Sequence, residues 1–178
     1  NKLYLDKWDT FVNASELQKK EAVIQFSTIV HNEDLHNQSG KIGIKIYSPA
    51  GNEVFSTSQD VILSEGTPVA TSFSLKKPEL WSVDTPVLYT AEVSLSSDGK
   101  EYDKISVPFG IRTLSFSAEK GFLLNGKSMK LKGGCVHHDN GLLGAAAIDR
   151  AEERKVELMK ANGYNAVRCA HNQVSEHF

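Results

Sequence analysis

The chain has 178 residues, of which 40% are hydrophobic and 24% are charged, and its formal net charge at pH 7 is -2. This balance is typical of a folded globular protein, and the near-neutral charge provides no basic field for nucleic acid or an anionic membrane surface. The apolar stretch from Leu142 to Ile148 is far too short to span a bilayer, and no signal peptide is apparent at the N-terminus. Two cysteines are too few for a disulfide framework.

Residues 1–116 are predicted to form β-strands only. Apolar and polar residues alternate with the period of two that is typical of strands. The alternating segments are residues 22–31, 41–46, 69–75, 87–95 and 105–109. Turn-forming residues at 48–52 and 96–100 separate some of these segments. Strands at this spacing over roughly 100 residues, without helical periodicity, indicate an immunoglobulin-like β-sandwich.

The pattern changes after Phe116. The dipeptide Asn125–Gly126 predicts the turn of a hairpin with arms at residues 122–124 and 129–131. A segment rich in glycine and histidine follows, from Gly133 to Gly144.

One helix is predicted next, with Asp149 as its N-cap, Glu152 completing a capping box and Gly163 as its left-handed terminator. An apolar stripe supports this helix, although Lys155 interrupts it. The stripe consists of Ala151, Val156, Leu158 and Met159. Residues 164–168 are then predicted to form a short buried strand.

The last third therefore reads as strand, helix, strand, which is the βαβ unit of a parallel sheet. Two parallel strands cannot cover their own faces, so residues 117–178 are expected to begin a larger, truncated α/β domain. We expect this uncovered unit to be mobile, to pack on the sandwich, or to be buried by a second copy of the chain.

Four of the six histidines and both cysteines lie from Cys135 onward. His137 follows the first parallel strand, His171 follows the second, and Arg168 lies at the end of the second. Because functional groups gather at the carboxyl ends of parallel strands, His137 and His171 are expected at the same rim. Cys135 and Cys169 are expected to be small buried thiols that pack the strands rather than redox groups or ligands.

Three interpretations of this cluster remain open. Imidazole and amide groups can hydrogen-bond sugar hydroxyls while an arginine keeps a carboxylate ionised. Histidine, aspartate and cysteine are also metal ligands, but no standard zinc spacing is present. The third interpretation is that these are ordinary loop histidines. The clustering at two strand ends favours the sugar-binding rim.

Four segments then carry a more specific signal. They are PELWSVDTPVLY at 78–89, FGIR at 109–112, FLLNGKSMKLKGGCVHHDNGLLGAA at 122–146 and MKANGYNAVRCAHN at 159–172. In this order the segments resemble the family 2 glycoside hydrolases, whose usual plan is a jelly roll, an immunoglobulin-like sandwich and a (β/α)8 barrel. The resemblance implies a sandwich over residues 1–116 and the truncated βαβ start of the barrel over residues 117–178.

The resemblance further implies that the full-length parent is a retaining, exo-acting β-glycosidase, with β-galactosidase as the best match. His137, His171 and Asn172 would bind the carbohydrate substrate, and Arg168 would support the nucleophile. Asn172 stands where many members carry an aromatic residue. The acid/base and nucleophile glutamates would come from later barrel strands, so the chain alone is expected to be inactive. No metal and no cofactor is implied.

No nucleic-acid or membrane partner is expected. We do expect self-association through the exposed truncated barrel segment. The alternative function is a non-catalytic carbohydrate-binding or interaction module, for which an exposed Trp8 or Trp81 would provide a sugar platform. Trp81 would otherwise pack in the sandwich core. Galactoside, glucuronide and mannoside enzymes share the motifs above.

Overall fold

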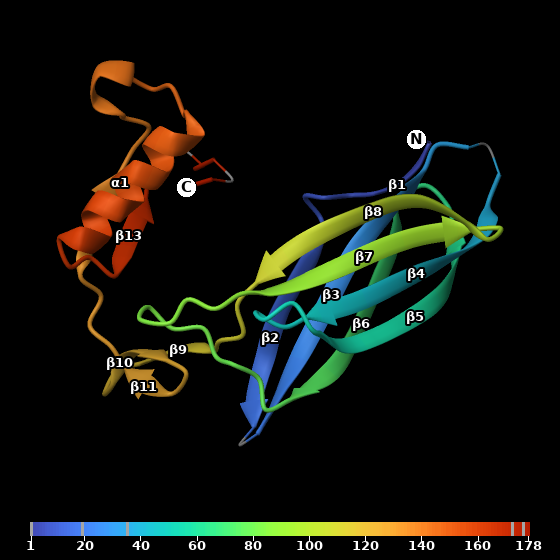
Figure 1. The fold of residues 1–178 in the computed structure, drawn as a ribbon, viewed down its shortest axis with the longest axis horizontal. Coiled ribbons are helices and arrows are strands. Elements are labelled where there is room, and N and C mark those ends of the chain that lie inside the picture. The colour runs from blue at the N-terminus through green and yellow to red at the C-terminus, as the bar shows by residue number, and fades with distance from the viewer. Residues whose placement is uncertain (1, 19, 35, 172, 176) are drawn as a thin grey trace. The chain divides into compact units, whose positions relative to one another are not determined.

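The computed structural model describes residues 2–18, 20–34, 36–171, 173–175 and 177–178. The chain forms two compact units, Asn1–Ser115 with Leu123–Lys127, and Phe116–Phe122 with Ser128–Phe178. Strands dominate the first unit, and the α-helix lies in the second (Figure 1). Across the described ranges, no helix is long and apolar enough to cross a membrane.

The first unit is an immunoglobulin-like sandwich of two antiparallel sheets, which Figure 1 shows stacked on each other. In one sheet β3 is central and pairs with β1, β2 and β6, and the other sheet has the order β5-β4-β7-β8. The strands are β1 Leu3–Leu5, β2 Phe11–Gln18, β3 Glu21–Asn32, β4 Gln38–Tyr47, β5 Glu53–Leu63, β6 Thr67–Lys76, β7 Tyr89–Ser97 and β8 Lys100–Phe109. The sandwich prediction is therefore confirmed.

The core lies between the two sheets and is built from the alternating aliphatic positions. Ile42, Ile44 and Ile46 of β4 are all buried, and Val93 of β7 is buried opposite Ile44. Burying one such side chain contributes roughly 1.5–3 kcal/mol. The alternation that predicted the strands is thus the same pattern that builds the core.

Strand β5 was not among the predicted segments because it is an edge strand with little burial. Most of its residues are exposed, and only Leu63 at its end is fully buried. An edge strand that packs few side chains needs no alternation, so its sequence carries no period-two signal.

The irregular connection between β6 and β7 is fixed by specific hydrogen bonds. The Tyr89 hydroxyl accepts the Glu79 N–H at 2.9 Å, and the Trp81 N–H donates to the Ile111 carbonyl at 3.0 Å. Asn125 Nδ2 donates to the Trp81 carbonyl at 3.0 Å. A Cβ on Gly110 would lie 3.0 Å from atoms of Trp81, so glycine permits this close packing. Residues of three of the family-like segments therefore meet around Trp81.

The predicted hairpin turn is confirmed, since Asn125 and Gly126 have φ values of 51° and 75°. The strands here are β9 Leu114–Ser117, β10 Gly121–Leu124 and β11 Lys127–Ser128, in the order β11-β10-β9. The second arm begins directly after the turn, not at residue 129 as predicted, because a two-residue turn pairs the residues that flank it.

The predicted βαβ unit is confirmed in the second unit of the chain. It contains β12 Gly133–Val136, the 3-10 helix η1 Gly141–Leu143, α1 Asp149–Ala161 and β13 Ala166–Cys169, with β12 and β13 parallel. The prediction that the second strand is buried is wrong, since Val167 of β13 is 39% exposed. Two strands and one helix do not supply enough surface to cover both faces of this sheet.

The two ends of α1 differ in how they are capped. The N-cap is Ile148 rather than Asp149, and no side chain caps this end, so the predicted capping box is wrong. Asp149 is the first helical residue, and its carboxylate lies 3.3 Å from His177 Nδ1. At the other end, Gly163 has φ 81°, and the Tyr164 N–H donates to the Met159 carbonyl at 3.1 Å. This is a Schellman motif, as the glycine predicted.

The pairing of β12 with β13 provides a matched pair of glycine variants. A Cβ at Gly133 would lie 1.7 Å from the Ala166 carbonyl oxygen, whereas one at Gly134 would meet nothing closer than 3.9 Å. We expect Gly133→Ala to destabilise the second unit by about 1–3 kcal/mol and Gly134→Ala to have little effect. Hydrogen exchange of the Ala166 and Ala170 amides measures this, and equal exchange in both variants would contradict the expectation.

Candidate functional site

The candidate site lies where β12 and β13 end, and the parallel register brings it together. Cys135 pairs with Arg168 and Val136 with Cys169, so both strands end at the same edge. The imidazole rings of His137 and His171 have centroids 5.8 Å apart and are tilted by 30°. The predicted closeness of these two histidines is therefore confirmed.

Arg168 is exposed on β13, and its Nη1 lies 3.9 Å from Cys135 Sγ, as expected for residues paired in register. Its guanidinium is thus held at the sheet rather than in a distant loop. Asn172, the remaining predicted substrate ligand, lies outside the described residues.

The prediction that both cysteines are buried is wrong, since Cys135 and Cys169 are free and exposed. The cause is the same uncovered sheet that exposes β13. Cys169 lies opposite Val136 rather than Cys135, and adjacent strand positions point to opposite faces, so the two thiols are not placed for a disulfide.

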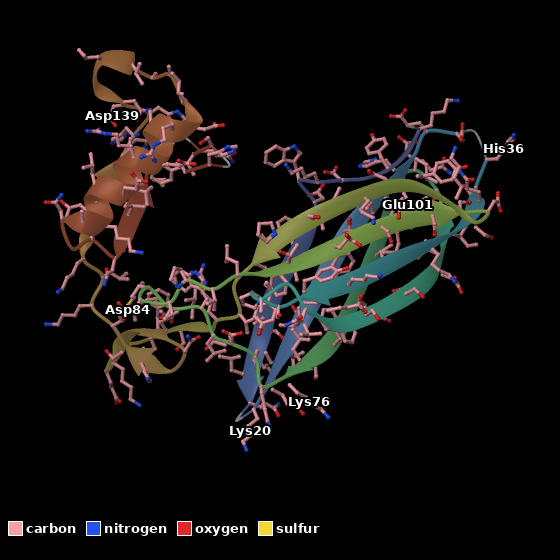
Figure 2. The ribbon with its side chains drawn as sticks, in the orientation of Figure 1. Lys20, His36, Lys76, Asp84, Glu101 and Asp139 are labelled. Atoms are coloured by element: carbon pink, nitrogen blue, oxygen red, sulfur yellow. The ribbon has the colours of Figure 1, made fainter. Side chains whose placement is uncertain are left out.

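The loop after β12 carries His138 and Asp139, and Figure 2 labels Asp139. The His138 Nε2 contacts the backbone carbonyl of Gln173, which links the segments that follow the two strands. Within the part of the chain that the structure describes, no group of three or more His, Cys, Asp or Glu side chains could hold a metal ion.

Sequence reasoning missed a polar network on the buried face of α1. Glu152 is 3% exposed, and its Oε1 accepts a hydrogen bond from Asn140 Nδ2 at 2.6 Å. Lys155 Nζ donates to the same Glu152 oxygen and to the His137 backbone carbonyl, both at 3.3 Å. The predicted stripe is wrong at Leu158, which is exposed, whereas Lys155 interrupts the stripe as predicted and lies on the less exposed face. Glu152 escaped notice because a charged residue is not expected at a buried helix position.

A second missed residue is Asn165, which joins the segments leading into the two strands. Its Oδ1 accepts the Lys132 N–H at 2.7 Å, and its Nδ2 donates to the Lys130 carbonyl at 3.0 Å. This side chain satisfies backbone groups directly before β12. An asparagine at this position of the segment 159–172 thus ties the start of β13 to the start of β12.

The other glutamates of α1 are engaged elsewhere. The Arg150 guanidinium lies 2.8 Å from Glu157 and 3.1 Å from Glu153 at exposed positions. Glu176 lies outside the described residues. The three glutamates of α1 thus form ion pairs on the helix surface or belong to the buried network.

The two tryptophans of the sandwich differ in accessibility. The Arg112 guanidinium carbon lies 4.4 Å from the centroid of the Trp81 ring, so an arginine occupies part of the ring surface that a sugar would use. Trp8 is 78% exposed. Only Trp8 of the two therefore offers an open ring.

Sequence models of one family match nearly the whole chain. The model described as Glycosyl hydrolases family 2 matches residues 4–112, and the model described as Glycosyl hydrolases family 2, TIM barrel domain, matches residues 117–178. Beta-galactosidase BoGH2A from Bacteroides ovatus is 37% identical over 172 residues, which cover 96% of this chain and 20% of that protein. A beta-glucuronidase from Bacteroides fragilis is 38% identical over 117 residues, covering 64% of this chain and 17% of that protein.

Solved structures agree with these relatives. The crystal structure of a glycosyl hydrolase family 2 member from Bacteroides cellulosilyticus DSM 14838 superposes with a TM-score of 0.94 at 43% identity, covering 99% of this chain and 25% of that one. A crystal structure of a beta-glycosidase from Bacteroides vulgatus gives a TM-score of 0.88 at 32% identity, with coverage of 100% and 22%. The chain spans about a fifth of the length of the curated relatives named above.

The buried network makes a prediction about pH. The hydrogen bond from Asn140, with help from Lys155, holds the pKa of Glu152 below the ordinary value of 4.5 despite its burial. The network is therefore complete above this value and is lost as the pH falls through the lowered pKa. We expect the NMR signals of the Asn140 side-chain amide to titrate with a midpoint below 4.5 and the Glu152→Gln variant to lack this step. A midpoint at or above 4.5 would contradict the assignment.

Proposed function

Because the chain belongs to glycosyl hydrolase family 2, we propose that it is part of a retaining, exo-acting β-glycosidase that hydrolyses terminal β-linked sugars. The observation that carries the proposal is the meeting of the His137 and His171 rings, 5.8 Å apart, at the ends of neighbouring parallel strands. Active sites of (β/α)8 barrels lie at this end of their strands. The piece would comprise the sandwich, residues 1–116, and the start of the barrel, residues 117–178.

A β-galactoside is the substrate that we propose. The Bacteroides ovatus relative, named a beta-galactosidase, is 37% identical over 96% of the chain, whereas a beta-glucuronidase that aligns with 94% of the chain is 29% identical. The higher identity over a nearly equal share of the chain favours the galactoside.

His137 and His171 would bind the sugar from one side. Ring centroids 5.8 Å apart leave no room for a sugar between them, because a sugar packed between two rings needs about 7 Å at contact distances of about 3.5 Å. Each neutral imidazole has one donor and one acceptor nitrogen, which suits hydroxyl groups. Asn172 follows His171 directly in the sequence and would add an amide to this side.

Arg168 would act on the charge of the nucleophile. A guanidinium close to a carboxylate favours its ionised form, which is the form that attacks the anomeric carbon. In a retaining glycosidase this attack forms a covalent glycosyl-enzyme, which water then hydrolyses, using two carboxyl groups about 5 Å apart. We propose that both carboxyl groups lie in parts of the longer protein outside this chain. The engagement of Glu152, Glu153 and Glu157 in other contacts supports this proposal.

The alternative, a stand-alone carbohydrate-binding module, has less support. It would depend on Trp8 alone, since Arg112 lies over Trp81.

The uncovered sheet supports a proposal about partners as well. Val167 and Tyr164 are exposed large side chains on or beside β13, and such surface favours association with a second copy of the chain. We expect sedimentation velocity to show a dimer that grows with concentration and that Val167→Lys removes. Ile62→Lys, at an exposed position of edge strand β5, is the matched control and should leave association unchanged. A wild-type monomer at all concentrations would contradict the proposal.

Turnover of aryl β-galactosides tests the proposed activity. We expect no turnover from the isolated chain and turnover from the longer protein that contains it. In that protein, His137→Ala and His171→Ala should each lower kcat/KM by about 100-fold, the size of effect seen when one transition-state hydrogen bond is removed. His36→Ala, in the connection between β3 and β4 of the sandwich, should have no effect (Figure 2). Full activity in both rim variants, or turnover by the isolated chain, would refute the proposal.

A further inference from the structure

Helix α1 packs two charged side chains where apolar ones are usual. Glu152 is 3% exposed and the Lys155 side chain is 17% exposed, and the two form an ion pair at 3.3 Å. Removing charges from water costs free energy that a buried pair rarely recovers, and an apolar pair of similar volume is often as stable or more so. Stability is therefore a poor explanation for charges at these two positions.

The contacts of this pair converge on the loop after β12. Lys155 Nζ reaches the His137 carbonyl at 3.3 Å and lies 3.9 Å from Asp139 Oδ1. Glu152 accepts the Asn140 side-chain amide at 2.6 Å, and the same amide donates to the Ala146 carbonyl at 3.1 Å. From helix α1, Lys155 thus holds His137 at the start of the loop, and Glu152 holds Asn140 near its middle.

We propose that Glu152 and Lys155 are positioning residues that hold the loop of residues 137–146 so that the His137 ring faces His171. The inference deepens the proposed function, because it concerns how the sugar-binding rim keeps its shape. The backbone of His137 is anchored from α1, while His171 follows β13. Without the anchor, the distance between the two rings would depend on the loop alone.

The test separates positioning from stability by making the helix face apolar. In the double variant Glu152→Leu, Lys155→Met of this chain, we expect hydrogen exchange of the Asp139, Asn140 and Gly144 amides to rise about tenfold or more while α1 amides keep their protection. The nuclear Overhauser contact between the His137 and His171 rings should weaken or disappear. Glu152→Gln, which keeps an acceptor for Asn140, should retain the ring contact.

A matched control lies on the exposed side of the same helix. Arg150 and Glu157 form an ion pair at 2.8 Å, and the double variant Arg150→Leu, Glu157→Leu should leave the loop and the ring contact unchanged. An unchanged ring contact in the Glu152 and Lys155 double variant would overturn the proposal, and so would loss of α1 protection together with the loop. Hydrogen exchange and the ring contact are measured without a sugar. The proposed function is tested separately, by the activity of the His137 and His171 variants in the longer protein.

Discussion

The parallel pairing of β12 with β13 is the constraint on which the candidate site depends. At Gly133 the neighbouring strand comes so close that a Cβ would meet the Ala166 carbonyl oxygen at 1.7 Å. Glycine permits this approach in the register that places Cys135 beside Arg168 and both strand ends at one edge. A shift of one residue would turn Arg168 to the opposite face of the sheet. The placement of the two strand ends that carry the rim is thus a product of backbone packing.

The two units of the chain obtain their order from different sources. In the sandwich, alternating aliphatic side chains form a continuous core. Buried polar groups there bond to one another, as Thr10 and Thr28 do through a hydrogen bond at 2.7 Å. The βαβ unit has few fully buried apolar side chains and relies on Asn165, the Glu152 network and the Schellman motif. Polar contacts are directional, so they determine loop geometry more closely than apolar packing does.

The sequence predicts those elements whose residues face a core. The alternation in β3, β4 and β6 follows from two-layer packing, and the turns at Asn125 and Gly163 follow from their left-handed backbones. Edge strand β5 escaped prediction because solvent imposes no pattern on it. The meeting of His137 and His171 was predictable from topology, whereas the exposed cysteines and the role of Glu152 were not. Those depend on how much of the sheet is covered and on which polar groups the loop presents to α1.

The closed core of the sandwich also bears on synthesis by the ribosome. All its buried members lie between Leu3 and Ile111, so each is translated before β12. The intervening residues take on the order of seconds to add, and sandwiches fold in roughly milliseconds to seconds. A sandwich that folds in milliseconds therefore buries its strands before the exposed strands of the next unit emerge. This order separates in time two sets of β-segments that could otherwise mispair.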